Sequence, residues 1–211
     1  IRNEELKLWG NGPSNNFELC SEGGYMVLKG FNTIHGIEDF EGEEVVNVDG
    51  GVLFSDLNIY LTSHQKSLGY FIPAYGDISV AGFVANDGHG SIAGDEGADI
   101  VPFIRSIDKM NQRGQITTYS KQCTKKSLWK ALMADQGMMG ITISLRIKIR
   151  ALFKVEIRIY QLGDTDVFKP NGFKAIADDC QNHMTMEWFT DANKSFITCG
   201  TETTKDVSGP D

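Results

Sequence analysis

From residue 71 to residue 100 the chain reads FIPAYGDISVAGFVANDGHGSIAGDEGADI, and this segment is the most informative part of the sequence. It contains six glycines and no Lys or Arg. Each glycine costs a helix about 0.8–1.0 kcal/mol relative to alanine, so we expect a non-helical segment whose backbone comes close to a ligand. Because the segment has no cation, a bound phosphate would be held by backbone N–H groups. That arrangement suits a buried diphosphate better than a triphosphate on magnesium.

The composition limits the class of protein. With 211 residues, 41% hydrophobic and 23% charged, the chain is typical of an ordinary globular protein of one domain, or one domain and part of another. A net charge of −8 argues against nucleic acid or an anionic membrane as a partner. The sequence has no transmembrane stretch and does not start with a signal peptide, so we expect a cytoplasmic protein. It gives no indication of the oligomeric state.

The four cysteines are widely spaced and include no C-x-x-C pair, which makes a zinc site improbable. They are Cys20, Cys123, Cys180 and Cys199. We therefore expect no metal, and we expect reduced thiols rather than disulfides.

The hydrophobic pattern predicts a mixed α and β protein. Strands are expected at residues 6–9, 25–28, 44–48, 104–109, 115–119 and 141–149. Helices are expected at 55–67, with Ser55 as N-cap and Gly69 just past the end, and at 126–133. After Phe153 the character changes, with a strand at 155–160, a helix near 173–182 and a hairpin around 191–193. This change predicts a boundary between one domain at residues 1–150 and a second at 151–211.

Five runs, taken in order, resemble the FAD-linked oxidases of the vanillyl-alcohol oxidase and p-cresol methylhydroxylase (PCMH) type. They are GNGPSNN (10–16), FNTIHGI (31–37), VVNVDGGVLFSDLNIYL (45–61), GYFIPAYGDISVAGFVANDGHGS (69–91) and SLWKALMADQGMMGITISLRIKI (127–149). Within that family the chain looks most like the flavin subunit of the decaprenylphosphoryl-ribose 2'-epimerase and like sugar-alcohol and aldonolactone oxidases.

The resemblance implies an α+β fold, with a two-subdomain PCMH-type FAD-binding domain at 1–150 and the start of an α+β cap, or substrate, domain at 151–211. Relatives have a further strand–helix–strand unit before the first glycine loop and continue beyond the start of the cap, so we expect the 211 residues to be a fragment. Many relatives attach flavin through a histidine where this chain has Pro13. FAD is therefore expected to bind noncovalently.

The resemblance also implies site residues. The first loop, which wraps the flavin diphosphate in relatives, is Gly10, Asn11, Gly12, Pro13 and Ser14. The second flavin loop supplies Ile78, Ser79, Gly82, Ala85, Asn86, Gly88 and Gly90, and the third segment supplies Gly137, Gly140 and Ile141. His89 is expected to line the flavin face as the catalytic residue of these loops. The essential base is expected outside the 211 residues.

Each feature has a simpler alternative. GNGPSN lacks the third glycine of a dinucleotide fingerprint and could be a plain loop. His89 could be an ordinary loop histidine, and Asp87 a turn-forming residue. Two function classes follow. The first is an FAD-dependent oxidoreductase that oxidises a carbinol C–H of a sugar, polyol or related alcohol. The alternative is a catalytically inactive flavin- or nucleotide-binding homologue that acts as a binding module.

Overall fold

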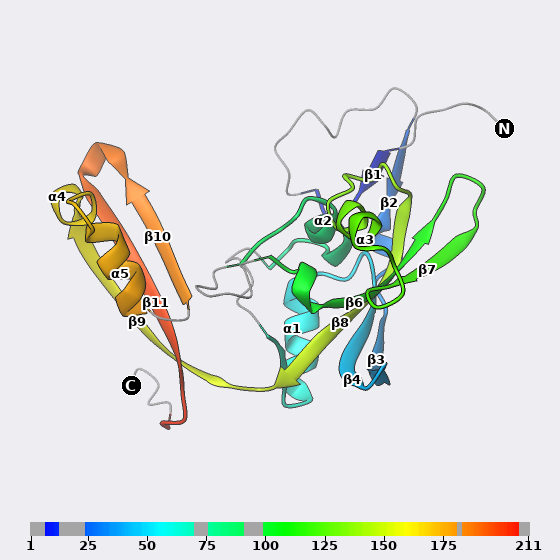
Figure 1. The fold of residues 1–211 in the computed structure, drawn as a ribbon, viewed down its shortest axis with the longest axis horizontal. Helices are drawn as coiled ribbons and strands as arrows, with labels where there is room; N and C mark the ends of the chain where they lie inside the picture. Colours follow the sequence, from blue (N-terminus) through cyan, green and yellow to red (C-terminus); the bar gives the residue numbers. More distant parts are fainter. Residues whose placement is uncertain (1–6, 13–23, 70–75, 91–98, 181–182, 207–211) are drawn as a thin grey trace. The chain divides into compact units, whose positions relative to one another are not determined.

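The computed structural model describes residues 7–12, 24–69, 76–90, 99–180 and 183–206. The chain divides into two compact units (Figure 1). The first comprises Ile1–His89 and Asp99–Ala151, and the second comprises Gly90–Ala98 and Leu152–Asp211.

The first unit is built on a six-stranded antiparallel sheet with the strand order β3-β4-β8-β6-β7, in which β5 also pairs with β8. Its strands are β3 (Ile34–Phe40), β4 (Glu43–Asp49), β5 (Lys66–Leu68), β6 (Ile104–Met110), β7 (Ile116–Ser120) and β8 (Ile141–Ala151). A separate parallel pair joins β1 (Lys7–Trp9) to β2 (Tyr25–Val27). The helices are α1 (Phe54–Ser63), α2 (Val80–Ala85) and α3 (Lys126–Met133), with short 3-10 turns at Leu28–Gly30 and Val101–Phe103. The α+β prediction is confirmed, and the described residues contain no doubly wound parallel sheet.

The turn at residues 49–52 ties four parts of this unit together. Gly50 N–H donates to the Ile143 carbonyl at 2.7 Å, and Gly51 N–H donates to the Phe31 carbonyl at 2.7 Å. Two carbonyls of the turn accept hydrogen bonds from α2: Ala81 N–H donates to the Gly50 carbonyl and Val80 N–H donates to the Val52 carbonyl, each at 2.9 Å. A Cβ on Gly50 would lie 2.6 Å from the Thr142 carbonyl oxygen, so only glycine fits.

Helix α1 differs at both ends from its prediction. It begins at Phe54, and its N-cap is Leu53, which makes no side-chain capping bond, rather than Ser55. It ends at Ser63, not at residue 67 before Gly69, because Gln65 has a left-handed φ of 57° and Lys66–Leu68 pair with β8. Pairing with the sheet therefore overrides the helical pattern of this segment.

Helix α2 corrects the expectation of a non-helical glycine-rich segment. Its Val80, Ala81, Phe83 and Val84 are buried, and the Phe83 ring packs edge-on against Phe54 at 5.0 Å between centroids. Burial of four side chains outweighs the cost of one glycine in so short a helix. Strand β3 was also not predicted, whereas α3 has the bounds expected from the sequence.

The second unit contains a three-stranded antiparallel sheet with the order β10-β11-β9. Its elements are β9 (Lys154–Gly163), α4 (Asp164–Val167), α5 (Gly172–Cys180), β10 (His183–Phe189), a 3-10 turn at Thr190–Ala192 and β11 (Lys194–Thr203). The predicted hairpin around 191–193 is confirmed, and Asn193 closes it with a φ of 52°.

The two faces of this sheet differ. Alternate side chains of β9 and β11, such as Tyr160 and Ile197, face a small core that also contains Val167 and Ile176 from the helices. The opposite face, which we call the open face, carries the large apolar side chains Ile157, Ile159, Phe189 and Phe196, each at least 38% exposed. An apolar face of this kind typically marks a binding surface.

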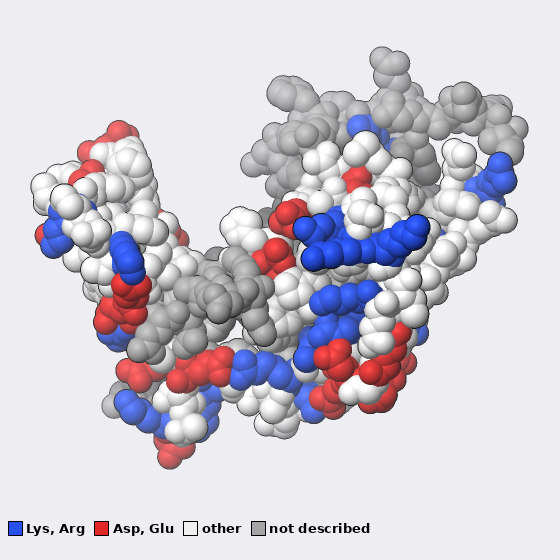
Figure 2. Space-filling model, in the orientation of Figure 1, with Lys and Arg blue, Asp and Glu red and all other residues white. Residues whose placement is uncertain are grey.

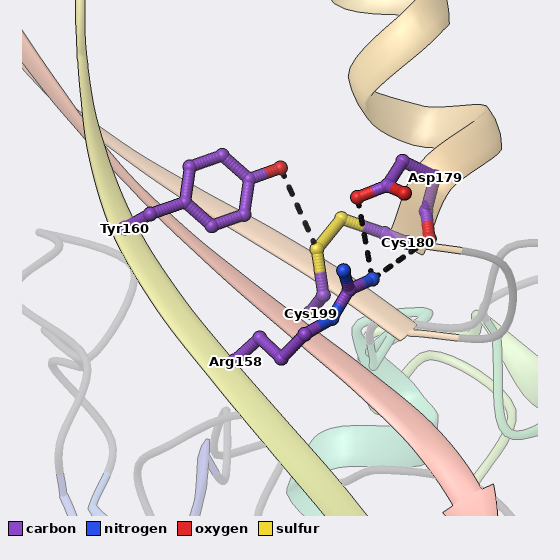
Figure 3. Close-up of a disulfide and its surroundings, with 5 residues drawn as sticks. All are labelled: Arg158, Tyr160, Asp179, Cys180 and Cys199. Carbon is purple, nitrogen blue, oxygen red and sulfur yellow. Dashed lines mark hydrogen bonds and ion pairs between the residues drawn. A yellow bond between two sulfur atoms is a disulfide. The ribbon is translucent and has the colours of Figure 1, made fainter.

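The cysteine expectation is wrong for one pair. Cys180, at the end of α5, and Cys199, on β11, form a disulfide with their Cα atoms 4.8 Å apart (Figure 3). The Tyr160 hydroxyl lies 3.8 Å from Cys199 Sγ, and burial raises the pKa of Tyr160. Beside them Arg158 forms an ion pair with Asp179 at 3.2 Å, in the turn of α5 next to the disulfide. The spacing of 19 residues gave no sequence signal, because the two cysteines meet only when α5 packs on β11 in the tertiary structure. Cys123 is a free, exposed thiol, and Cys20 lies outside the described residues.

Charged side chains gather on the first unit. Figure 2 shows Lys and Arg side chains over α3, with a separate acidic group on the same face. Glu43 forms ion pairs with Arg105 and with Lys148, the latter at 2.7 Å. The hydrogen bond from Arg105 and then that from Lys148 lower the pKa of Glu43 to about 2. The lysines around α3 are Lys125, Lys126 and Lys130.

We predict that the disulfide is a main source of stability in the second unit, because its core contains few side chains. Replacing both cysteines by alanine should lower the free energy of unfolding of this unit by about 3 kcal/mol, the value for a loop of this length. Hydrogen exchange of β9, β10 and β11 would report the loss. Cys123→Ala is the matched control and should leave exchange unchanged. Equal protection in the double variant and the control would contradict the prediction.

Candidate functional site

The first two predicted flavin loops meet in the structure. Asn11 Nδ2 donates to the Asp77 carbonyl at 3.0 Å. Gly10 lies so close to Ser79 that a Cβ on Gly10 would overlap the Ser79 hydroxyl oxygen. The two segments therefore touch each other, although Asn11 and Asp77 are 66 residues apart in the sequence.

The third predicted segment joins them. Gln136 N–H donates to the Ala85 carbonyl, at the end of α2, at 2.9 Å. Gly137 has a φ of +80°, and a Cβ on it would lie 3.9 Å from the Leu8 side chain on β1. Figure 1 shows α2 and α3 close together near β1 and β2. The structure thus brings the three predicted segments together around α2.

Ser79 organises the start of α2. Its hydroxyl is the N-cap and accepts from Gly82 N–H at 3.4 Å, and a Cβ on Gly82 would lie 2.9 Å from the same oxygen. The sequence pattern Ser79-Val-Ala-Gly contained this cap, which is a usual role for serine before an apolar run.

The amides at the start of α2 are already bonded within the protein. Val80 and Ala81 donate to the turn at 49–52, and Gly82 donates to Ser79. These three N–H groups are not available to a phosphate, so the expectation that this loop holds a phosphate with its backbone depends on other amides of the loop.

Other glycines in the second loop accommodate the protein itself. A Cβ on Gly88 would overlap the Phe83 ring, so packing rather than a positive φ requires glycine there. The left-handed residue is Asp87, with a φ of 52°, which supports its reading as a turn-former. Asn86 Nδ2 donates to the Gly82 carbonyl at 2.8 Å and so closes α2.

Most of the remaining predicted residues lie within the described ranges, and two do not. Gly12 has a φ of +78° and packs against the Trp9 indole, and Gly140 has a φ of +101° with the Met110 carbonyl oxygen 2.5 Å from where its Cβ would be. Ile78 precedes Ser79, Ile141 begins β8, and Gly90 is the last residue described before residue 99. Pro13 and Ser14 lie outside the described residues.

His89 is exposed and forms an isolated antiparallel bridge with Asp99. This position is consistent with either reading of His89, as a loop residue or as a residue near the cofactor. Among the described residues, no group of three or more His, Cys, Asp or Glu side chains could hold a metal ion.

Sequence reasoning missed a buried ion pair next to the third segment. Lys109 on β6 and Asp135 after α3 lie with Nζ and Oδ2 2.5 Å apart, and their side chains are 4% and 0% exposed. A lysine within a predicted strand does not by itself indicate that its side chain is buried. Asp135, two residues before Gly137, carried only the weak signal of a turn-forming residue.

We predict that the contact between Gly10 and Ser79 sets the geometry of the first loop. Gly10→Ala should weaken FAD binding, because a new methyl group in a packed site typically costs about 1–3 kcal/mol. Ser79→Ala removes the oxygen that this methyl group would meet, so the double variant should bind FAD better than the sum of the two single effects. Fluorescence titration with FAD measures this coupling.

Gly30→Ala is the control, because a Cβ on Gly30 meets nothing within 4 Å. Additive effects in the Gly10 and Ser79 cycle would show that the two residues are not coupled.

Comparison with known proteins identifies the family. A model of the family described as FAD binding domain matches residues 2–120, which is 119 of the 211 residues. None of the curated proteins matches the chain.

Solved structures agree on the fold. The cholesterol oxidase from Brevibacterium sterolicum and a histidine-to-alanine mutant of it match with TM-scores of 0.80 and 0.81, at 15% identity. Each match covers 98% of this chain and 43% of the oxidase chain, so the chain spans less than half the length of these proteins. At this identity the likeness concerns the fold alone, and it confirms the expected architecture. The chain belongs to the FAD binding domain family, and its cofactor is FAD.

Proposed function

We propose that the protein is an FAD-dependent oxidoreductase that oxidises the carbinol C–H of an alcohol. The observation that carries the proposal is the meeting of three distant segments around α2. Gly10–Gly12, Ile78–Ala85 and Gln136–Gly140 are joined by the Asn11–Asp77 and Gln136–Ala85 hydrogen bonds and by the Gly10–Ser79 contact. These are the segments for which the sequence resemblance implies flavin contact.

The assembled segments fit FAD in a specific way. Gly12, Gly137 and Gly140 have positive φ, which L-residues rarely adopt. Trp9 and the Met110 carbonyl occupy the space beside Gly12 and Gly140, whereas a Cβ on Gly137 would meet only the Leu8 side chain, 3.9 Å away, so Gly137 leaves its backbone open to a ligand. The first amides of α2 and the N–H groups of Gln136, Gly137, Met138 and Met139 all donate within the protein. The first loop therefore carries more of the proposed amide contact, and the Gln136–Gly140 turn contributes the shape of its backbone. FAD, when bound, supplies the hydride acceptor, and the protein supplies position and exclusion of water. Pro13 in place of a histidine supports noncovalent binding.

The substrate class is the finer part of the proposal. The resemblance suggests sugars, polyols or related alcohols. The fold is shared with a cholesterol oxidase, and cholesterol is also an alcohol. Residues 151–211 are proposed to begin the substrate domain.

His89 is proposed to position or polarise the substrate alcohol. It lies four residues after Ala85, whose carbonyl contacts the third segment, and its bridge to Asp99 fixes the local backbone. The base that removes the hydroxyl proton is proposed to lie in another part of the protein. The alternative function, a flavin-binding module without catalysis, would share all of these contacts and differ only in turnover.

The disulfide bears on the compartment. None of the helices in the described ranges is long and apolar enough to cross a membrane. Buried disulfides such as Cys180–Cys199 are typical of proteins that fold in oxidising compartments. This supports an oxidising compartment rather than the cytoplasm suggested by the sequence.

We predict that the purified protein is yellow and that its flavin absorbance bleaches anaerobically on addition of a substrate alcohol. A panel containing a sterol, a long-chain alcohol, a sugar and a polyol would rank the substrate classes. Acid precipitation should release the flavin into the supernatant. Bleaching by no alcohol, with FAD bound, would favour the binding module, and a yellow acid pellet would contradict noncovalent attachment.

We predict that His89→Ala lowers turnover by a factor within or below the roughly 10²–10⁴ typical of a positioned acid or base, while FAD stays bound. Single-turnover reduction of the flavin measures the step directly. His64→Ala, at an exposed histidine that bonds only locally at the end of α1, is the matched control. Turnover equal to that of the unsubstituted protein would make His89 a structural loop residue.

A further inference from the structure

The buried ion pair of Lys109 and Asp135 has no evident value for stability alone. Nζ and Oδ2 are 2.5 Å apart, and neither side chain is more than 4% exposed. Burial lowers the pKa of Lys109, and the hydrogen bond to Asp135 opposes that shift. Replacement of such pairs by apolar residues of similar size is often neutral or stabilising, so a buried pair is weak evidence for a stabilising role.

Asp135 makes further contacts that point to another role. Its Oδ1 accepts from Gly137 N–H at 3.2 Å, and its Oδ2 accepts from Met139 N–H at 3.3 Å. Its carbonyl accepts from Met138 N–H at 2.8 Å. One buried carboxylate therefore binds both the lysine and two amides of the turn that follows it.

That turn is conformationally demanding. Gln136, Gly137 and Gly140 have φ values of 50°, 80° and 101°, all in the left-handed region. A non-glycine residue such as Gln136 persists there only where its surroundings hold it. The Asp135 carboxylate and the Gln136–Ala85 hydrogen bond are the described contacts that do so.

We propose that the Lys109–Asp135 pair is the positioning device that holds the Gln136–Gly140 backbone in the shape that binds FAD. Asp135 is a positioning residue, since it acts through the amides of Gly137 and Met139, and Lys109 fixes the carboxylate from β6. The inference rests on the proposed function, because it assumes that this turn contacts the cofactor.

The test separates the acceptor role of Asp135 from its charge. Asp135→Ala alone leaves Lys109 buried without a partner and risks loss of the fold, so two double variants are compared. Lys109→Met with Asp135→Ala removes the charge and both acceptor oxygens. Lys109→Met with Asp135→Asn removes the charge and keeps one carbonyl oxygen for Gly137 N–H. The control is Glu43→Gln. It breaks the ion pair with Lys148, which lies toward the C-terminal end of β8, whereas the turn before Ile141 lies at the other end of that strand.

The readouts are FAD affinity by fluorescence titration, the visible circular dichroism of bound FAD, and the unfolding midpoint. We expect the alanine double variant to lose about 10- to 100-fold in FAD affinity and to change the flavin dichroism, since a lost buried hydrogen-bond partner has effects of this size. The asparagine double variant should recover most of the affinity, and Glu43→Gln should keep all of it.

Equal affinity and equal dichroism in the two double variants would overturn the inference, whether both match the unsubstituted protein or both are weakened. Such a result would mean that the pair acts only on the stability of the fold or only through its charges, and not through the acceptor oxygens of Asp135. If the unsubstituted protein itself binds no FAD, the proposed function fails first and the inference with it. The two failures are therefore distinguishable.

Discussion

At the turn of residues 49–52, backbone segments from four parts of the first unit come so close that two adjacent residues have no room for a side chain. A Cβ on Gly50 would meet the Thr142 carbonyl, and one on Gly51 would overlap the Leu28 carbonyl. The same turn receives the first two amides of α2. The position of α2 is thus fixed by hydrogen bonds to the turn that follows β4, and the three segments proposed to contact FAD are arranged around α2.

This constraint changes how the small residues of the site are understood. Gly82 and Gly88 are glycines because Ser79 and the Phe83 ring occupy the space beside them, not because a ligand does. Gly12, Gly137 and Gly140 have positive φ, which L-residues rarely adopt. Trp9 and the Met110 carbonyl also occupy the space beside Gly12 and Gly140, so most glycines of these segments are explained by backbone conformation and by packing within the protein.

The second unit is stabilised in a different way from the first. Its core is small, and a disulfide between α5 and β11 compensates for the limited apolar burial. One face of its sheet is covered by helices and the other presents Ile157, Ile159, Phe189 and Phe196. Strand alternation alone produces this division, since successive side chains of β9 and β11 point to opposite faces.

The sequence by itself determined the family, the α+β class, helix α3 and the alternation of β8, and it picked out three segments that the structure brings together. These features depend on local periodicity and on motif order. Only the tertiary structure decided that Val80–Ala85 is helical, that α1 ends at Ser63, that Cys180 pairs with Cys199 and that Lys109 meets Asp135. Each depends on partners distant in the chain, 26 residues apart for the ion pair and further for the pairing of β5 with β8, and no local pattern records such contacts.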